Sequence, residues 1–211
     1  MRRHLLVFSC PLIVLAGLSP LAGASDPVVS LYPQIHPILN CEPPLSCSRA
    51  EQVTINAFTV YVYVVVAKGD PVDGVSSASF GIATESSMFL EWSLCADSES
   101  SGANWPGNGS GNRVTWDTNN CQRTVLNPDG VHAVAGTMYV YTYGANYLEI
   151  TPNNSVNPPE FEITDCTGGT APIVAGGRMG FGDEPGYNPC TSGVPVEPSR
   201  WGQIKALFRE P

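Results

Sequence analysis

The chain has 211 residues, and 19 acidic side chains against 10 basic ones give it a formal net charge of −9. This charge repels phosphate backbones and anionic lipid, so nucleic acid is excluded as an expected partner. Charged residues make up only 14% of the chain, whereas about 25% is usual in a soluble domain. Ser, Thr, Asn and Gly must therefore supply much of the polar surface, as they do in turn-rich extracellular β proteins.

The first 24 residues have the layout of a secretory signal peptide. Arg2 and Arg3 precede an apolar stretch over residues 5–18, and Ala22-Gly23-Ala24 forms a small-residue cleavage site. The apolar stretch is shorter than the roughly 20 residues that span a bilayer. We expect cleavage before Ser25, no membrane insertion afterwards, and a secreted, extracellular or cell-surface protein, with the periplasm as an alternative.

Six cysteines follow the predicted signal peptide, and an even number in an exported chain indicates three disulfides. We predict that neighbours in the sequence pair: Cys41–Cys47, Cys95–Cys121 and Cys166–Cys190. A zinc site is the alternative. It is disfavoured because there is no C-x-x-C motif and only His36 and His132 remain after cleavage.

The segment that follows the signal peptide, residues 25–52, is rich in proline and predicts an irregular N-terminal arm. Residues 53–67 then give the strongest strand signal of the chain. They are dense in β-branched and aromatic residues and apolar on both faces, which favours a central strand. Further strands are predicted, separated by turns and by a loop over residues 96–112, at residues 75–83, 88–95, 112–117, 131–143, 147–151, 160–165 and 173–181.

About nine short strands without a convincing helical period predict an all-β fold. We expect an antiparallel β-sandwich of the immunoglobulin-like or cohesin-like kind over residues 53–194. In the tail, residues 195–211, Ser199 can cap a short helix. This tail is expected either to dock on the sandwich or to serve as an exposed sorting segment.

No catalytic residues are identified in the sequence. His36 and His132 are the only bases available to a Ser or Cys nucleophile, and residues 107–111 lack the G-x-S-x-G spacing. Glu160 and Glu162 would be neighbours on one strand, so they cannot flank a sugar from opposite sides as glycosidase carboxylates do. The chain is therefore predicted not to be an enzyme.

No cofactor is predicted, but calcium is kept as an alternative. Three turns carry two carboxylates each, and calcium takes six to eight oxygen ligands in such loops. These pairs are Asp70 with Asp73, Asp97 with Glu99, and Asp183 with Glu184.

Aromatic residues give the clearest binding signal. Tyr139, Tyr141 and Tyr143 alternate along one predicted strand, and Tyr61 and Tyr63 alternate along another. Successive side chains in a strand point to opposite faces, so five tyrosines would share one sheet face if these strands pair. Such a face suits stacking on sugar rings, whereas packing of the rings in the core is the alternative.

Among the tryptophans, Trp105 in its Gly-rich loop is the one expected to be exposed. It joins the five tyrosines as a candidate ligand-binding residue.

The strand pattern resembles that of cohesin-type and related carbohydrate-binding β-sandwiches of secreted bacterial proteins. The resemblance covers residues 53–190 and is carried by Val60-x-Val-x-Val, Gly74-Val75, Phe80-Gly81-Ile82 and the long strand from Gly136. The chain is also similar to exported bacterial proteins with a Gly-Val-His-Ala-Val-Ala-Gly run, here residues 130–136, and a Gly-Tyr-Asn-Pro-Cys ending, here residues 186–190.

These observations predict a secreted or cell-surface binding or structural module without catalysis of its own. Its partner would be a polysaccharide or a surface protein. Two alternatives stay open: a carboxylate-dependent glycoside hydrolase, and a self-associating structural subunit of the cell envelope. The oligomeric state is not predicted.

Overall fold

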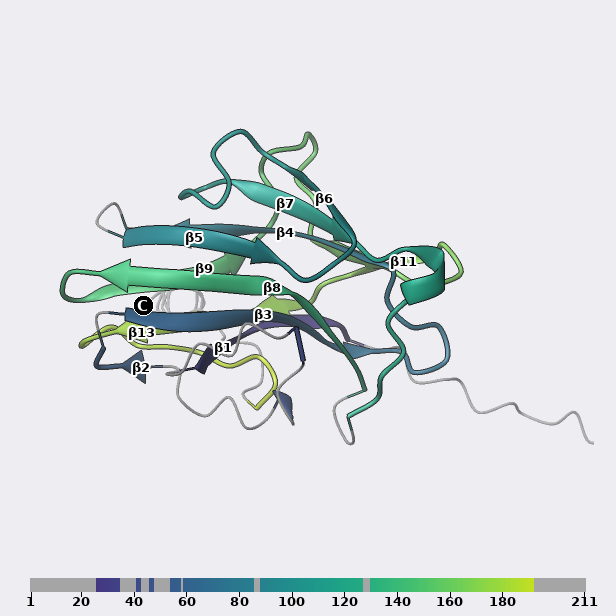
Figure 1. Cartoon of the computed structure of the whole chain (residues 1–211), viewed down its shortest axis with the longest axis horizontal. Coiled ribbons are helices and arrows are strands. Elements are labelled where there is room, and N and C mark those ends of the chain that lie inside the picture. The colour runs from purple at the N-terminus through teal and green to yellow at the C-terminus, as the bar shows by residue number, and fades with distance from the viewer. Residues whose placement is uncertain are drawn as a thin grey trace, which may run out of the picture.

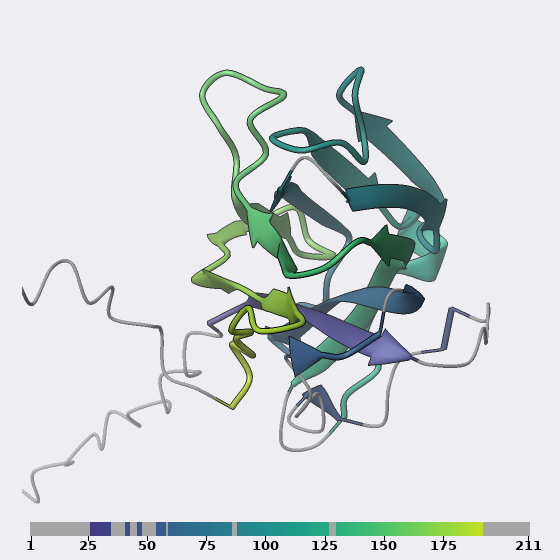
Figure 2. The same ribbon diagram turned by 90° about the vertical axis from the view of Figure 1, so that its left-hand side faces the viewer.

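The computed structural model describes residues 26–34, 41–42, 46–47, 54–57, 59–85, 88–126 and 130–191. The predicted signal peptide and the predicted C-terminal tail lie outside these residues. The described chain forms two β-sheets that pack face to face, and Figure 2 looks onto the end of the sandwich that carries the β8–β9 turn. The predicted all-β sandwich is confirmed.

The first sheet has five strands in the order β12-β1-β3-β8-β5. Its long strands, β3, β8 and β5, lie side by side in Figure 1 and pair antiparallel. The strand bounds are β1 Val28–Gln34, β3 Thr59–Gly69, β5 Met88–Leu94, β8 Val131–Thr142 and β12 Ala175–Gly176. The prediction of a central strand is confirmed, because β3 lies between β1 and β8.

The second sheet has eight strands arranged around β4, which pairs with β7 along one edge and with β10 and then β9 along the other. Its bounds are β2 Thr54–Ile55, β4 Ser77–Thr84, β6 Ser98–Ser101, β7 Gly111–Thr115, β9 Asn146–Thr151, β10 Glu162–Thr164, β11 Thr170–Pro172 and β13 Arg178–Phe181. A single 3-10 turn, Thr118–Asn120, follows β7.

The core fills the space between the sheets with alternate side chains. In β3, Val60, Val62, Val64 and Val66 are fully buried and face the second sheet. Large buried side chains of the second sheet pack in the same core, and they include Phe80, Ile82, Leu148 and Phe181. Burial on this scale stabilises the fold by roughly 1.5–3 kcal/mol per large side chain. The fold therefore requires apolar residues at the inward positions, whereas the outward positions can carry other residue types.

Two expectations about the strands are wrong. The described residues form 13 strands rather than about nine, because strands of two to four residues are too short to show alternation. The arm expected over residues 25–52 contains β1, a member of the first sheet. Its proline, Pro33, is tolerated because β12 pairs only with Val28 and Val29, so β1 has an open edge beyond them.

The predicted disulfide pairing is also wrong. The structure joins Cys41 to Cys95, Cys47 to Cys190 and Cys121 to Cys166, with Cα–Cα distances of 5.4, 5.7 and 5.9 Å. The prediction assumed small local loops. Strand pairing instead brings together segments that lie 54, 143 and 45 residues apart, and these long-range pairs follow the sandwich rather than the sequence.

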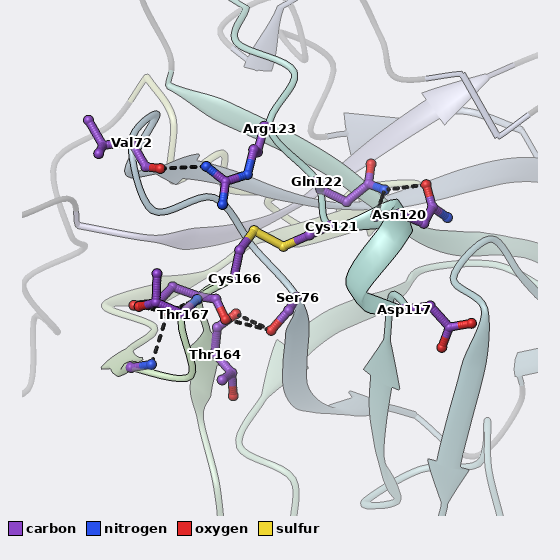
Figure 3. Close-up of a disulfide and its surroundings, with 12 residues drawn as sticks. Val72, Ser76, Asp117, Asn120, Cys121, Gln122, Arg123, Thr164, Cys166 and Thr167 are labelled. Carbon is purple, nitrogen blue, oxygen red and sulfur yellow. Dashed lines mark hydrogen bonds between the residues drawn. A yellow bond between two sulfur atoms is a disulfide. The ribbon is translucent and has the colours of Figure 1, made fainter.

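Figure 3 shows how the third disulfide is placed. Cys121 follows the 3-10 turn and Cys166 follows β10, and both segments border the start of β4. There the Ser76 hydroxyl donates hydrogen bonds to the carbonyl oxygens of Thr164 at 3.2 Å and Asp165 at 2.7 Å. Gly74, with φ of +72°, lies against the Cys166 sulfur, where a Cβ atom would clash.

Candidate functional site

The candidate site lies on the outer face of the first sheet. The pairing on which the tyrosine prediction depends is present, with Tyr61 opposite Tyr139 and Thr59 opposite Tyr141. Strand β5 adds Phe89 opposite Tyr141. We call the set of Tyr61, Phe89, Tyr139, Tyr141 and Tyr143 the tyrosine face.

The rings of the tyrosine face contact one another across three strands. Tyr139 is the centre, with the ring centroid of Tyr61 at 5.3 Å and that of Phe89 at 6.5 Å. Phe89 is 56% exposed and Tyr143 is 71% exposed, whereas the other three side chains are half-buried. Tilted and edge-to-face contacts of this kind hold each ring in place, so the face is organised without a ligand.

Tyr141 and Tyr143 form a second contact at the end of β8. Their ring centroids lie 4.8 Å apart at an interplanar angle of 84°. A side-chain hydrogen bond with Tyr143 is the main cause that raises the pKa of the Tyr141 phenol, and burial adds to it. The Tyr141 hydroxyl therefore stays protonated at neutral pH and can donate as well as accept hydrogen bonds.

Tyr63 was expected on this face, but it lies buried at 3% exposure. It packs with Val65 and Val134, against Tyr32 and Cys95. Burial, and then the charge of Glu42, raise the pKa of Tyr63. Cys95, which packs against this cluster, is joined by a disulfide to Cys41, the neighbour of Glu42 in the chain.

Trp105 was expected to be an exposed loop residue, and this is wrong. Its ring makes edge-to-face contacts with Phe80 at 5.9 Å and with Trp92 at 5.3 Å. Phe80 belongs to the core between the sheets, so Trp105 packs against the edge of that core. The Gly-rich composition of its loop indicates a turn but not the direction in which the loop folds.

Phe89 is the member of the site that the sequence analysis missed. The alternation of β5, in which Phe89 and Glu91 are exposed and Leu90 and Trp92 are partly buried, could have placed it on an outer face. The register of β5 against β8, which brings Phe89 beside the tyrosines, follows from the fold and not from the sequence of either strand.

No cation of the described chain lies on the tyrosine face. Two of the four described cations are held elsewhere by carboxylates: Arg113 by Glu160 and Glu162, and Arg178 by Glu149 and Glu184. The other two, Arg123 and Lys68, donate to the carbonyl oxygens of Val72 and Pro189. The charged neighbour of the tyrosine face is an acid, because Glu91 pairs with Tyr139.

The carboxylates considered for glycoside hydrolysis are held in an ion-pair cluster. Arg113 lies 2.7 Å from a Glu160 oxygen and 3.1 Å from a Glu162 oxygen. The hydrogen bond from Arg113, helped by one from Ser79, lowers the pKa of Glu160. A general acid needs a raised pKa, so the pKa of Glu160 is shifted in the direction opposite to the one that this role requires.

In one of the three pairs considered for calcium, both carboxylates have partners within the chain. Asp97 accepts hydrogen bonds from the Asp117 backbone and the Asn120 amide, and Glu99 accepts from Trp92 and Asn112. Across the residues that the structure describes, no group of three or more His, Cys, Asp or Glu side chains is placed to hold a metal ion.

Of the two histidines weighed for catalysis, His132 is buried in β8 at 1% exposure, and His36 lies outside the described residues. Within those residues, no helix has the length and hydropathy that a transmembrane helix requires.

No protein-family model matches the sequence, and no curated protein matches it. Among solved structures, the chain is similar to a module of a family 33 glycoside hydrolase from Clostridium perfringens, with 13% identity and a TM-score of 0.40. It is also similar to a protein crystallised with a dockerin from Clostridium thermocellum, with 11% identity and a TM-score of 0.42.

Both are cohesin modules. The alignments cover 74% and 76% of this chain, and 98% and 97% of the respective matches. Cohesins are the family whose strand pattern the sequence resembles. Both TM-scores are below 0.5.

Proposed function

We propose that this protein is a secreted or cell-surface module without catalysis of its own, and that its tyrosine face binds a neutral polysaccharide chain. The export follows from the predicted signal peptide. Three disulfides support it, because such bonds persist in oxidising compartments.

The observation that carries the proposal is the exposed ring cluster around Tyr139. Aromatic rings left in water on a sheet face are unusual unless something covers them. The rings offer apolar faces for the C–H groups of a sugar, and the hydroxyls of Tyr61, Tyr139, Tyr141 and Tyr143 can bond to sugar hydroxyls at the rim.

The size of the face favours a sugar chain over a protein partner. Three neighbouring strands span about 10 Å, and four residues along β8 span about 13 Å. A stable protein interface buries about 800 Å² on each partner, which is far more than this area. Another part of the sheet's outer face is covered, at the buried cluster of Val28, Cys47, Ala67 and Ala175.

The charge of the face favours a neutral ligand. The described cations are engaged elsewhere, and Glu91 borders the rings. An acidic polysaccharide would meet a carboxylate without a compensating cation, so sulfated and uronic acid chains are expected to bind poorly.

The test is a pull-down of the oxidised mature chain, residues 25–211, with insoluble cellulose, xylan and mannan and with acidic pectate and alginate. We expect retention on a neutral polysaccharide that is lost in Tyr139→Ala and Tyr141→Ala. Tyr147→Ala is the matched control, because Tyr147 is a half-buried tyrosine on the outer face of the second sheet, against Arg178.

Retention by none of the neutral polysaccharides contradicts the proposal. If sedimentation instead shows concentration-dependent assembly that Tyr139→Ala abolishes, the face joins copies of a structural subunit. Release of reducing sugar by the chain would favour the hydrolase.

A further inference from the structure

A cavity of about 340 Å³ opens at the edge of the sandwich beside the tyrosine face. It lies between the end of β4, the start of β5 and the loop that carries Trp105, and its lining includes Glu85, Phe89, Asn104, Pro106 and Asn108. The volumes of ligand pockets in proteins start at about 300 Å³, so this cavity is large enough to hold a small polar group. Phe89 belongs both to this lining and to the tyrosine face.

The wall formed by the loop is held firmly. The ring of Trp105 contacts Phe80 and Trp92 and so anchors the loop. Two backbone hydrogen bonds join the loop to β4: the Gly109 N–H donates to the Ile82 carbonyl, and the Ile82 N–H donates to the Ser110 carbonyl. A fixed wall loses little conformational entropy when a ligand binds, which makes the cavity a preformed site.

Polar groups in the lining are available to a ligand. The Asn108 side-chain oxygen accepts a hydrogen bond from the Thr84 backbone at 2.9 Å, which fixes the amide plane and leaves its N–H₂ group as donor. Glu85 and Asn104 are exposed. In the described part of the chain, no hydrogen bond or ion pair engages the Glu85 carboxylate or the Asn104 amide.

We propose that this cavity is a second sugar-binding subsite, which takes a hydroxyl-rich, uncharged residue of the same chain that lies on the tyrosine face. This inference rests on the proposed function. Phe89 stacks on the sugar from the side that it shares with the tyrosine face, Asn104 and Asn108 donate to hydroxyl oxygens, and the Glu85 carboxylate accepts from hydroxyl groups.

Glu85 also sets the specificity of the subsite. The described lining contains no Lys or Arg, so a uronic acid residue would place its carboxylate near Glu85 without compensation. Sugars without an acidic group are therefore selected.

The experiment measures affinities by calorimetry for β-1,4-linked gluco-, xylo- and manno-oligosaccharides of increasing length, together with oligogalacturonides. For the best neutral series, we expect Asn104→Ala to weaken the longer oligosaccharides by about three- to tenfold, the range of one lost hydrogen bond. Short oligosaccharides that the tyrosine face can hold alone should be unaffected. Asn154→Ala is the matched control, an exposed asparagine outside the cavity.

Glu85→Gln keeps the shape of the side chain and removes its charge. We expect it to raise binding of oligogalacturonides relative to the neutral series, a change of selectivity that a merely structural residue would not produce. If Tyr139→Ala abolishes binding while Asn104→Ala and Glu85→Gln behave like wild type at every length, the subsite is overturned and the tyrosine face stands. If no oligosaccharide binds the wild-type chain, both proposals fail.

Discussion

The outer face of the first sheet carries aromatic rings, whereas the outer face of the second sheet carries small residues beneath paired charges. On β4 the outward positions are Ser77, Ser79 and Gly81, and the amide of Asn153 donates to the Ser79 hydroxyl at 3.0 Å. Arg113 joins two carboxylates above them. The Ser79 hydroxyl and the Arg113, Glu160 and Glu162 side chains of this face therefore have partners within the chain.

The tyrosine face is built in the opposite way. Its rings contact one another, but Tyr143 and Phe89 stay mostly in water and no ion pair of the described chain covers them. A face whose polar groups are already paired gains little free energy from binding a ligand, whereas exposed rings gain free energy when a ligand covers them.

The largest expected effect comes from the disulfide that holds the covered part of the first sheet. Replacing both partners, Cys47→Ala with Cys190→Ala, removes a link across 143 residues and should lower the free energy of unfolding by about 2–5 kcal/mol. Urea denaturation followed by circular dichroism measures this. An unchanged midpoint under oxidising conditions would show that the link does not hold this part of the fold.

The next effect concerns the rings themselves. The double variant Tyr61→Ala with Tyr139→Ala removes the contact at the centre of the tyrosine face, and the affinity for a neutral polysaccharide should fall about tenfold or more. Affinity electrophoresis in gels that contain the polysaccharide gives the ratio. An equal loss in Tyr147→Ala would mean that both outer faces bind, and the contrast between them would be lost.

A smaller effect is expected on the second sheet. Arg113→Gln leaves Glu160 and Glu162 without their cation, and stability should fall by about 0.5–1 kcal/mol because all three side chains are partly exposed. Thermal melting of this variant and of Arg123→Gln, as a control, measures the loss. Polysaccharide binding should not change, and a change would mean that the two faces are coupled.

The smallest effect depends on pH. The pKa of Glu160 is depressed in the folded state, chiefly by the hydrogen bond from Arg113. Its stabilising contribution is present above the ordinary carboxyl pKa of 4.5 and is lost as the pH falls through the lower folded value. Wild type should exceed Glu160→Gln in stability at pH 7, and this difference should vanish in stronger acid; a constant difference in urea midpoints would contradict it.

The contrast between the faces was only partly predictable. Alternation of Tyr139 and Tyr141 sufficed to place them on one side of a strand, and the apolar run of β3 sufficed to make that strand central. Tyr63 has the same alternation as Tyr61, yet it is buried, in a cluster that includes the disulfide-linked Cys95. Such burial depends on contacts between residues far apart in sequence.

The cysteines show the same limit. Their number predicted three disulfides, but each partner was set by strands that meet only in the folded sandwich. Phe89 lies on the tyrosine face because of the register of β5 on β8, and Trp105 is not exposed because its ring contacts Phe80. The local sequence pattern therefore sufficed to predict the strands and the face on which each side chain lies. Which of these side chains are buried depends on tertiary contacts that the local pattern does not contain.

The most direct test of the tyrosine face is nuclear magnetic resonance of the chain with isotope-labelled tyrosine, titrated with a soluble neutral oligosaccharide. The account predicts ring-signal shifts for Tyr61, Tyr139, Tyr141 and Tyr143, with Tyr147 on the opposite face and buried Tyr63 unmoved. Shifts at Tyr147 alone, or no shift at saturating oligosaccharide, would contradict the assignment of ligand binding to this face.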